Sequence, residues 1–329
     1  MKRYWKCVAL AVLSCGCIQA IQAAEQEAWP SRRVTMVVPF APGGATDIVA
    51  RILAPAMAEV LGQPVVVDNR PGASGNIGAM MVARAQPDGH TMVLSNVSLA
   101  SINPILFAAT LKMDLAKALT GVVLLASIPD VIVAKPDFPA SNAKELVAHA
   151  RAHPGKLNFS NPLGGYTHLY MLEWSGRTGM QLVNVPSKGP VQVVTSILGG
   201  EIHFSSLNSA SITPHVQAGR LKALAAVAPQ RLPALPEVPT LAESGYPGVG
   251  IVNWNGIFVP TGTPKPVIDR LHLITVKLME SPNIRQALEK AKVPVTLSKS
   301  PEDFQQFVRQ ELERAGRIIR ENNISLESP

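Results

Sequence analysis

The chain has 329 residues, of which 47% are hydrophobic and 16% are charged, and 30 Lys and Arg against 23 Asp and Glu give a formal net charge of +7. This length is enough for two ordinary domains with apolar cores. Basic and acidic residues alternate, as in RQELERAGRIIRE, so the charge pattern excludes a basic stripe of the kind that binds nucleic acid.

The first two dozen residues have the pattern of an export signal. Lys2, Arg3 and Lys6 precede an apolar run that is too short to span a bilayer, and small residues follow it. We expect cleavage after Ala23 or Ala24, which would remove three positive charges and leave a net charge of +4 (7 − 3). The mature protein is therefore expected in the periplasm.

All three cysteines, Cys7, Cys15 and Cys17, lie in this segment. Two alternatives to a cleaved signal stay open: Cys15 of VLSC carries a lipid anchor, or the segment is a buried first helix. A chain cleaved after the signal has no cysteine, so it needs no disulfide and has no metal site built on thiolates. Its stability must then come from the apolar core.

After the signal, strand-like apolar runs alternate with helix-like runs. Continuous apolar strands separated by helices indicate a parallel sheet that is covered on both faces. Thr46 or Asp47 is the expected N-cap of the first helix. In this first part we expect strands at 34–40, 64–69 and 91–95, a helix at 46–61, and a second helix that ends near 85.

A second α/β set begins near Val122. The proline-rich stretch 229–250 is expected to be an irregular linker between domains, and 251–260 a returning strand. Three amphipathic helices then close the chain, at 264–280, 282–291 and 301–321. Within the second set we expect strands at 121–127, 130–135, 157–161, 182–187, 202–207 and 221–227, and helices at 141–153, after the Gly164–Gly165 turn, at 190–200 and at 208–219.

The segment VPFAPGGATD (38–47) places two glycines between a buried strand and a helix start. Ligands of open parallel sheets lie beyond the carboxyl ends of strands, where helix N-termini attract anions. Gly43 and Gly44 would let the backbone approach a ligand closely and Thr46 offers a hydroxyl, although a tight turn with an ordinary cap explains the same residues. Similar loops follow at 95–104, 160–168, 185–192 and 205–211.

The order of these motifs resembles the Bug family, the periplasmic substrate-binding proteins of tripartite tricarboxylate transporters. The segment WPSRRVTMVVPFAPGGATD…QPDGHTMVL (29–94) carries the similarity, which continues through VPSKG, ILGGEIHF and PTGTPKPVIDRL over nearly the whole mature chain. The resemblance implies an α/β fold with two lobes, of the type II periplasmic binding proteins (Venus flytrap), with mainly parallel central sheets. It also implies discontinuous domains: signal 1–24, domain 1 from 25–122 and 251–329, and domain 2 from 123–250.

In that family a ligand carboxylate is held in the cleft between the domains, largely by backbone N–H groups and ordered water. The resemblance assigns this role to the loops Phe40–Asp47 and Ser95–Ser101, with the second domain contributing Ser160–His168, Ser187–Gly189 and the loop around Asn208. The residues themselves add Lys188, as a cation or a solvated loop lysine, and Trp254, as a cleft or core residue; His168 is a contact or a cap. The candidate ligand-binding residues are Phe40, Ala41, Gly43, Gly44, Thr46, Asp47, Ser95, Ser98, Ser101, Ser160, Asn161, Tyr166, Thr167, His168, Ser187, Lys188, Asn208 and Trp254.

The sequence departs from the family pattern at positions that affect specificity. Leu207 stands where many members have an acidic residue that in some receives a ligand ammonium group, and Ser187 replaces a frequent aromatic. The loop 160–168 is about one residue short. We therefore expect a ligand without an amino group, either a di- or tricarboxylate or an aromatic acid.

Motifs of catalysis are missing from the sequence. GASGN (72–76) lacks the second flanking glycine of a nucleophile elbow, and neither H-E-x-x-H nor a P-loop occurs. His149 and His153 have metal-compatible spacing, but no carboxylate or cysteine is placed to complete a metal site, so a solvent-facing helix explains them better. We expect no catalytic residue, metal or cofactor, and a monomer whose partners are a small carboxylate and a membrane permease, not nucleic acid. An orphan ligand sensor and an exported hydrolase remain the alternatives.

Overall fold

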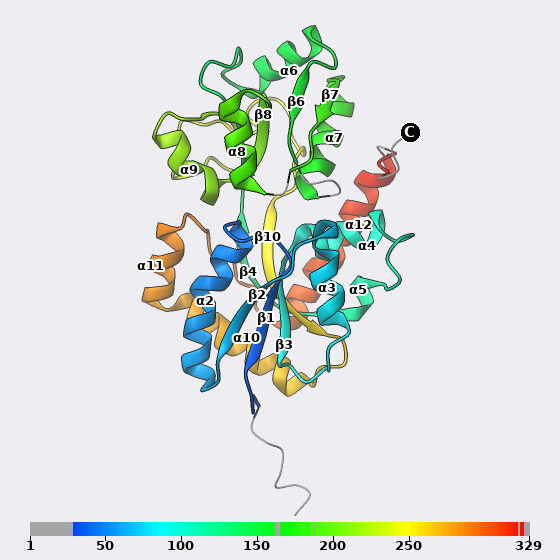
Figure 1. The fold of residues 1–329 in the computed structure, drawn as a ribbon, viewed down its shortest axis with the longest axis vertical. Coiled ribbons are helices and arrows are strands. Elements are labelled where there is room, and N and C mark those ends of the chain that lie inside the picture. Colours follow the sequence, from blue (N-terminus) through cyan, green and yellow to red (C-terminus); the bar gives the residue numbers. More distant parts are fainter. Residues whose placement is uncertain (1–28, 162–164, 188, 322, 326–329) are drawn as a thin grey trace, which may run out of the picture.

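The computed structural model describes residues 29–161, 165–187, 189–321 and 323–325. The described strands form two five-stranded sheets, in the orders β2-β1-β3-β10-β4 and β7-β6-β8-β5-β9. Figure 1 shows each sheet with its helices as one lobe, and the two lobes are stacked along the long axis of the molecule. The export signal expected at 1–24, and with it Cys15, lies outside the described residues.

Lobe 1 is built from both ends of the chain. Its strands are β1 (Val34–Val38), β2 (Val65–Asn69), β3 (Thr91–Asn96), β4 (Leu119–Ile128) and β10 (Asn253–Pro260). Its longer helices are α2 (Ala45–Leu61), α3 (Asn76–Ala83), α10 (Lys265–Glu280), α11 (Pro282–Lys290) and α12 (Pro301–Glu321). Its short helical turns, which the sequence did not indicate, are η1 (Ala73–Gly75), the π-helical η2 (Ser98–Ile102), α4 (Asn103–Leu106) and α5 (Leu115–Ala118).

Lobe 2 comes from the middle of the chain. The stretch 229–250 contains no named helix or strand, as the prolines predict, but it packs Leu232, Leu235 and Val238 into the lobe 2 core. The strands are β5 (Asp130–Ala134), β6 (Leu157–Phe159), β7 (Leu182–Asn184), β8 (Phe204–Asn208) and β9 (Lys222–Val227). The helices are α6 (Ala143–Ala152), α7 (Tyr166–Thr178), α8 (Pro190–Gly199) and α9 (Ser209–Gln217).

Both sheets are mixed, and the expected parallel arrangement holds for three strands of each. In lobe 1, β1 pairs in parallel with β2 and β3, whereas β10 runs antiparallel to β3 and β4. In lobe 2, β6 is parallel to β7 and β8, whereas β5 is antiparallel to β8 and β9. The β4–β10 pair is antiparallel because β4 leaves lobe 1 toward lobe 2 and β10 returns beside it.

The chain first changes sheets at Pro129, between β4 and β5. β4 pairs with β10 along its whole length, from Leu119 to Ile128, so residues 123–128 belong to the lobe 1 sheet and not to the second set in which the sequence placed them. Composition cannot reveal this point, because the runs on both sides of Pro129 are equally apolar. The full domain ranges stay a prediction.

Apolar side chains alternate along the central strands and bury both faces of the lobe 1 sheet. Val34, Met36 and Val38 pack with α2, α10 and α11, whereas Val37 and Val93 pack with α3 and α12. This two-sided burial is what the continuous apolar strands predict. Among the described residues, no helix is both long and apolar enough to cross a membrane.

Candidate functional site

A cavity of about 650 Å³ lies between the two lobes. Parallel strands end at one edge of a sheet, so the loops after β1 and β2 meet there, opposite the loops that precede α7, α8 and α9 of lobe 2. The residues that line this cavity are Pro39, Phe40, Ala41, Gly44, Ala45, Thr46, Pro71, Gly72, Ala73, Ser74, Gly75, Asn96, Tyr166, Pro186, Ser187, Gly189, Pro190, Asn208 and Asn253.

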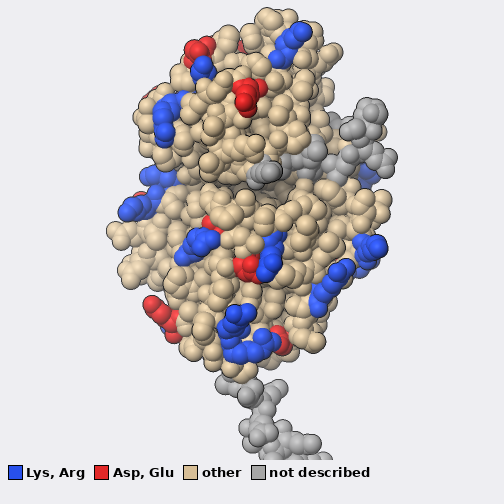
Figure 2. All heavy atoms as spheres, in the orientation of Figure 1, with Lys and Arg blue, Asp and Glu red and all other residues tan. Residues whose placement is uncertain are grey.

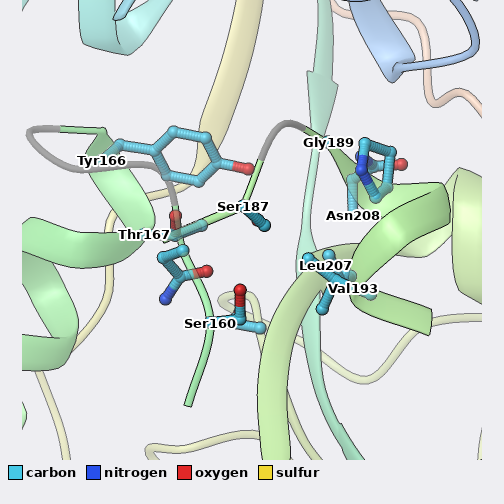
Figure 3. Close-up of a pocket in the computed structure, with 11 residues that line it drawn as sticks. Ser160, Tyr166, Thr167, Ser187, Gly189, Val193, Leu207 and Asn208 are labelled. Carbon is cyan, nitrogen blue, oxygen red and sulfur yellow. The ribbon is translucent and has the colours of Figure 1, made fainter. Parts of the chain in front are cut away.

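A side cavity of about 120 Å³ continues into lobe 2 (Figure 3). In Figure 3 the ring of Tyr166 extends from the start of α7 toward the loop of Ser187, while Ser160 and Thr167 lie on the same side of the pocket below it. Two buried polar atoms that line this cavity have no hydrogen-bond partner among the described residues, namely Nδ2 of Asn161 and Oγ of Ser187. The side cavity therefore offers donors to a polar ligand group.

Four helices begin at these cavities. Lining residues start α2 (Ala45), α7 (Tyr166) and α8 (Pro190), and Asn208 caps α9 by accepting a hydrogen bond from the backbone N–H of Ser211 at 3.0 Å. Helix N-termini carry a partial positive charge and unpaired N–H groups. No described residue that lines either cavity is Asp, Glu, Lys, Arg or His. The site is thus electropositive without a charged side chain in its described lining.

The first glycine loop is held in shape by Asp47. Gly43 has a φ of +82°, which favours glycine, and Gly44 rather than Thr46 or Asp47 is the N-cap of α2, so the predicted cap is wrong. The buried Asp47 carboxylate accepts hydrogen bonds from the N–H of Gly43, from Nε of Arg51 and from Nδ2 of Asn69, each at 2.9 Å. Burial alone would raise the pKa of Asp47, but these hydrogen bonds together lower it. Asp47 therefore fixes the loop and does not line the cavity.

Asp47→Ala is expected to loosen this loop, because the Gly43 N–H and the Asn69 amide lose their acceptor. A net contribution of about 0.5–1.5 kcal/mol for each lost hydrogen bond gives an expected loss of about 1–2 kcal/mol in the free energy of unfolding. Thermal melting measures the loss. Asp68→Ala is the matched control, since Asp68 lies near the end of β2 and its side chain bonds only to Arg70 among the described contacts. Equal melting temperatures for the two variants would contradict the positioning role of Asp47.

The second glycine loop, Pro71–Gly75, also lines the cavity, and sequence reasoning missed it. Ala73 and Ser74 both have positive φ, 46° and 55°, which is unusual for residues with a side chain. Buried Asn103 holds the loop by donating to the carbonyl oxygen of Ser74 at 2.9 Å. The order of the strands could have identified this loop, because the parallel pairing of β1 and β2 places the loops that follow them side by side.

The structure brings ten of the predicted site residues to the two cavities: Phe40, Ala41, Gly44, Thr46, Ser160, Asn161, Tyr166, Thr167, Ser187 and Asn208. Seven others do not line them: Gly43, Asp47, Ser95, Ser98, Ser101, His168 and Trp254. Lys188 lies outside the described residues.

The residues away from the cavities have other surroundings. Ser98 joins the lobes, because its Oγ accepts a hydrogen bond at 2.9 Å from the backbone N–H of Tyr166. Ser95 and Ser101 are fully buried in lobe 1. The ring of His168 stacks on Phe159, with 6.4 Å between centroids.

Trp254 is a core residue. Its indole packs edge-on against Phe304 and donates through Nε1 to Glu311 at 3.3 Å. Because side chains alternate along β10, its neighbour Asn253 points elsewhere and lines the cavity with an unpartnered Oδ1. The sequence indicated the right strand but the wrong residue on it.

Charged side chains do not form a single-sign patch on the face drawn in Figure 2. Lys and Arg are scattered over both lobes there, and several lie beside Asp or Glu. This matches the interleaved charges of the sequence. The electropositive character of the cleft comes from backbone dipoles rather than from a basic surface.

A family model described as "Tripartite tricarboxylate transporter family receptor", TctC, matches residues 49–324. The chain belongs to the TctC family. This TctC-family chain is also similar to the solved structure of "periplasmic binding protein BugD", with 32% identity, a TM-score of 0.82, and coverage of 90% of this chain and 99% of the other. The resemblance to the Bug family and the two-lobed binding-protein fold are thereby confirmed.

Two other solved structures similar to this TctC-family chain carry ligands in their descriptions. MatC from Rhodopseudomonas palustris, with bound malate, is 30% identical with a TM-score of 0.82, covering 88% of this chain and 100% of that one. Rpa4515 of R. palustris, with adipate, is 31% identical with a TM-score of 0.84, covering 90% and 99%. Proteins similar to this chain therefore include two whose structures hold a dicarboxylate.

Proposed function

We propose that this receptor binds a small dicarboxylate without an amino group in the cleft between its lobes. It does so in the periplasm, after export by its N-terminal signal, and presents the closed, loaded form to the permease of a tripartite transporter. The observation that carries this proposal is the convergence of four helix N-termini on a cavity whose described lining contains no charged side chain.

The distribution of these N-termini favours two anionic groups on the ligand. α2 begins on lobe 1, and α7, α8 and α9 begin on lobe 2, so each lobe offers N–H groups to one end of a ligand. Asn161 Nδ2 and Ser187 Oγ, which have no partner in the described part of the chain, add donors on the lobe 2 side. Malate and adipate, the ligands named for the two similar structures, both carry two carboxylate groups.

The residues that line the cavities also argue against an amino acid as the ligand. An α-ammonium group needs an anionic or multiple-carbonyl partner when it leaves water. Leu207, which borders the side cavity, replaces the acidic residue that the family resemblance leads one to expect. The ammonium group of aspartate or glutamate would thus be desolvated without a described carboxylate to receive it.

Ligand binding is expected to close the two lobes. A dicarboxylate held first by the α2 N-terminus would draw the lobe 2 helix starts toward it. The hydrogen bond from the Tyr166 N–H to Ser98 Oγ joins the lobes at the edge of this cleft and supports such a closed form.

A melting screen tests the proposal. The purified protein is heated with malate, succinate, adipate, citrate, benzoate, aspartate or glutamate. At a hundred times the dissociation constant a bound ligand adds about 2.7 kcal/mol of stability, which should raise the melting temperature by roughly 5–10 °C. We expect this shift for at least one dicarboxylate and none for aspartate or glutamate. Stabilisation by the amino acids alone would overturn the proposed ligand class, and turnover of any compound would point to the enzyme alternative.

A further inference from the structure

Asp130 is a buried acid at the point where the chain enters lobe 2. It is the first residue of β5, directly after Pro129, and it is fully buried. In the antiparallel pair β5–β8 it lies opposite Asn208, which caps α9 and lines both cavities. Directly opposed residues in antiparallel strands place their side chains on the same face of the sheet. Asp130 is therefore one strand away from the proposed site.

Two residues that line the side cavity bond directly to the Asp130 carboxyl group. The hydroxyl of Tyr166 donates to Oδ1 at 2.8 Å, and Oγ of Ser206 donates to Oδ2 at 3.3 Å. The hydroxyl of Tyr170 in turn donates to Oγ of Ser206. Asp130 thus stands behind the cavity wall, and Tyr166 and Ser206 separate it from a bound ligand by one side chain.

No cation compensates this carboxyl group among the described residues. The titratable groups that face it are the hydroxyls of Tyr166 and Tyr170, both on α7, and β8 contributes only the Ser206 hydroxyl. Burial raises the pKa of Asp130 to about 7, although the hydrogen bonds from Tyr166 and Ser206 act in the opposite direction. Asp130 can therefore gain or lose a proton near neutral pH.

We propose that Asp130 is a positioning residue that couples carboxylate binding in the cleft to the uptake of a proton. This inference rests on the proposed function. An anionic ligand group beside Tyr166 and Ser206 repels an ionised Asp130 through a poorly screened interior. Protonation removes that repulsion and lets Asp130 donate a hydrogen bond to Ser206 while it still accepts one from Tyr166.

The direction of the pH dependence follows from this coupling. The negative charge of the ligand raises the pKa of Asp130 above its value in the free protein. The liganded protein therefore binds more protons than the free protein in this pH range. Affinity must then rise as the pH falls through this range, and it levels off below about pH 6. Burial lowers the pKa of His168, the histidine on α7, so this neighbouring ring is disfavoured as the group that takes up the proton.

The experiment is a calorimetric titration at pH 6.5, 7.5 and 8.5 with the dicarboxylate that gives the largest melting shift among malate, succinate and adipate. These diacids stay ionised throughout this range. The wild-type protein is expected to bind about tenfold more tightly at pH 6.5 than at pH 8.5. Asp130→Asn, a neutral residue of the same shape, is expected to bind equally at all three values, near the wild-type affinity at pH 6.5. Asp137→Asn, an exposed acid of the same lobe, is the matched control and should keep the wild-type slope.

The outcomes separate the two proposals. If a dicarboxylate binds with the same affinity at all three pH values, or if Asp130→Asn keeps the wild-type slope, the proton coupling is overturned and the proposed function stands. A uniform loss of affinity in Asp130→Asn with an unchanged slope would reduce Asp130 to a structural role. Failure of every diacid to bind at any pH overturns both.

Discussion

Asn208→Asp is expected to weaken dicarboxylate binding by roughly 30- to 1000-fold, which corresponds to about 2–4 kcal/mol for a charge 4–8 Å from the ligand. Asn208 lines both cavities, and the substitution puts a carboxylate where the described lining has none. Lobe 2 should stay folded, because Asp serves as well as Asn in capping a helix and Oδ1 of Asn208 is the atom that accepts from Ser211.

Isothermal titration with the dicarboxylate found in the melting screen measures this loss. Asn142→Asp is the matched control, because Asn142 is also an N-cap of lobe 2, accepting from the N–H of Glu145 at 3.0 Å, but caps α6 away from the cleft. Figure 1 shows α6 at the far end of lobe 2 from lobe 1. Comparable affinities for the two variants would mean that no anionic group binds near α9.

Gly256→Ala is expected to lower the free energy of unfolding by about 2–3 kcal/mol, the cost of overpacking a filled core. Gly256 lies in the middle of β10, and a Cβ there would be 2.9 Å from the carbonyl oxygen of Val123 and nearer still to Cζ of Phe304. Gly121 on β4 leaves similar room, since its Cβ would lie 2.9 Å from Cδ1 of the same ring. The two glycines form a slot for the fully buried Phe304 of α12.

A double-mutant cycle in urea tests this slot. Phe304→Ala alone should cost about 3–5 kcal/mol because it leaves a cavity. The variant with both substitutions should lose at least 1 kcal/mol less than the sum, since the added methyl group and the ring no longer compete for space. Gly199→Ala is the control, because no atom lies within 4 Å of its added Cβ, and it should be neutral. Strict additivity would show that Gly256 and Phe304 do not share a slot.

The sequence predicted where the loops of the site lie, but not what each side chain in them does. Alternating strands and helices placed Gly44, Thr46 and Tyr166 at strand-to-helix junctions, and these residues do meet at one cavity. It could not show that Asp47 turns away to hold Gly43, because a carboxylate after a glycine pair is equally compatible with ligand contact and with a structural hydrogen bond. Only its three partners distinguish the two roles.

Residues on β10 and in the loop after β2 show what a sequence pattern cannot predict. Trp254 is a plausible cleft residue in the sequence, but the pairing of β10 with β3 and β4 places Trp254 in the core and its neighbour Asn253 at the cavity. The loop Pro71–Gly75 became part of the site because β2 lies beside β1. Neither fact is local, since both depend on strands far apart in the chain.

The sequence by itself determined the α/β class, most helices and strands, the abundance of Ser, Asn, Gly and Pro in the junction loops, and the absence of an acid at Leu207. These properties follow from local periodicity and residue chemistry, which each segment carries wherever it packs. The tertiary structure alone decided that β4 belongs wholly to lobe 1, that four helix N-termini face one cavity, and that Asp130 is buried behind Tyr166. Those features depend on which strands pair and on which surfaces exclude water, and both are settled only when distant parts of the chain pack together.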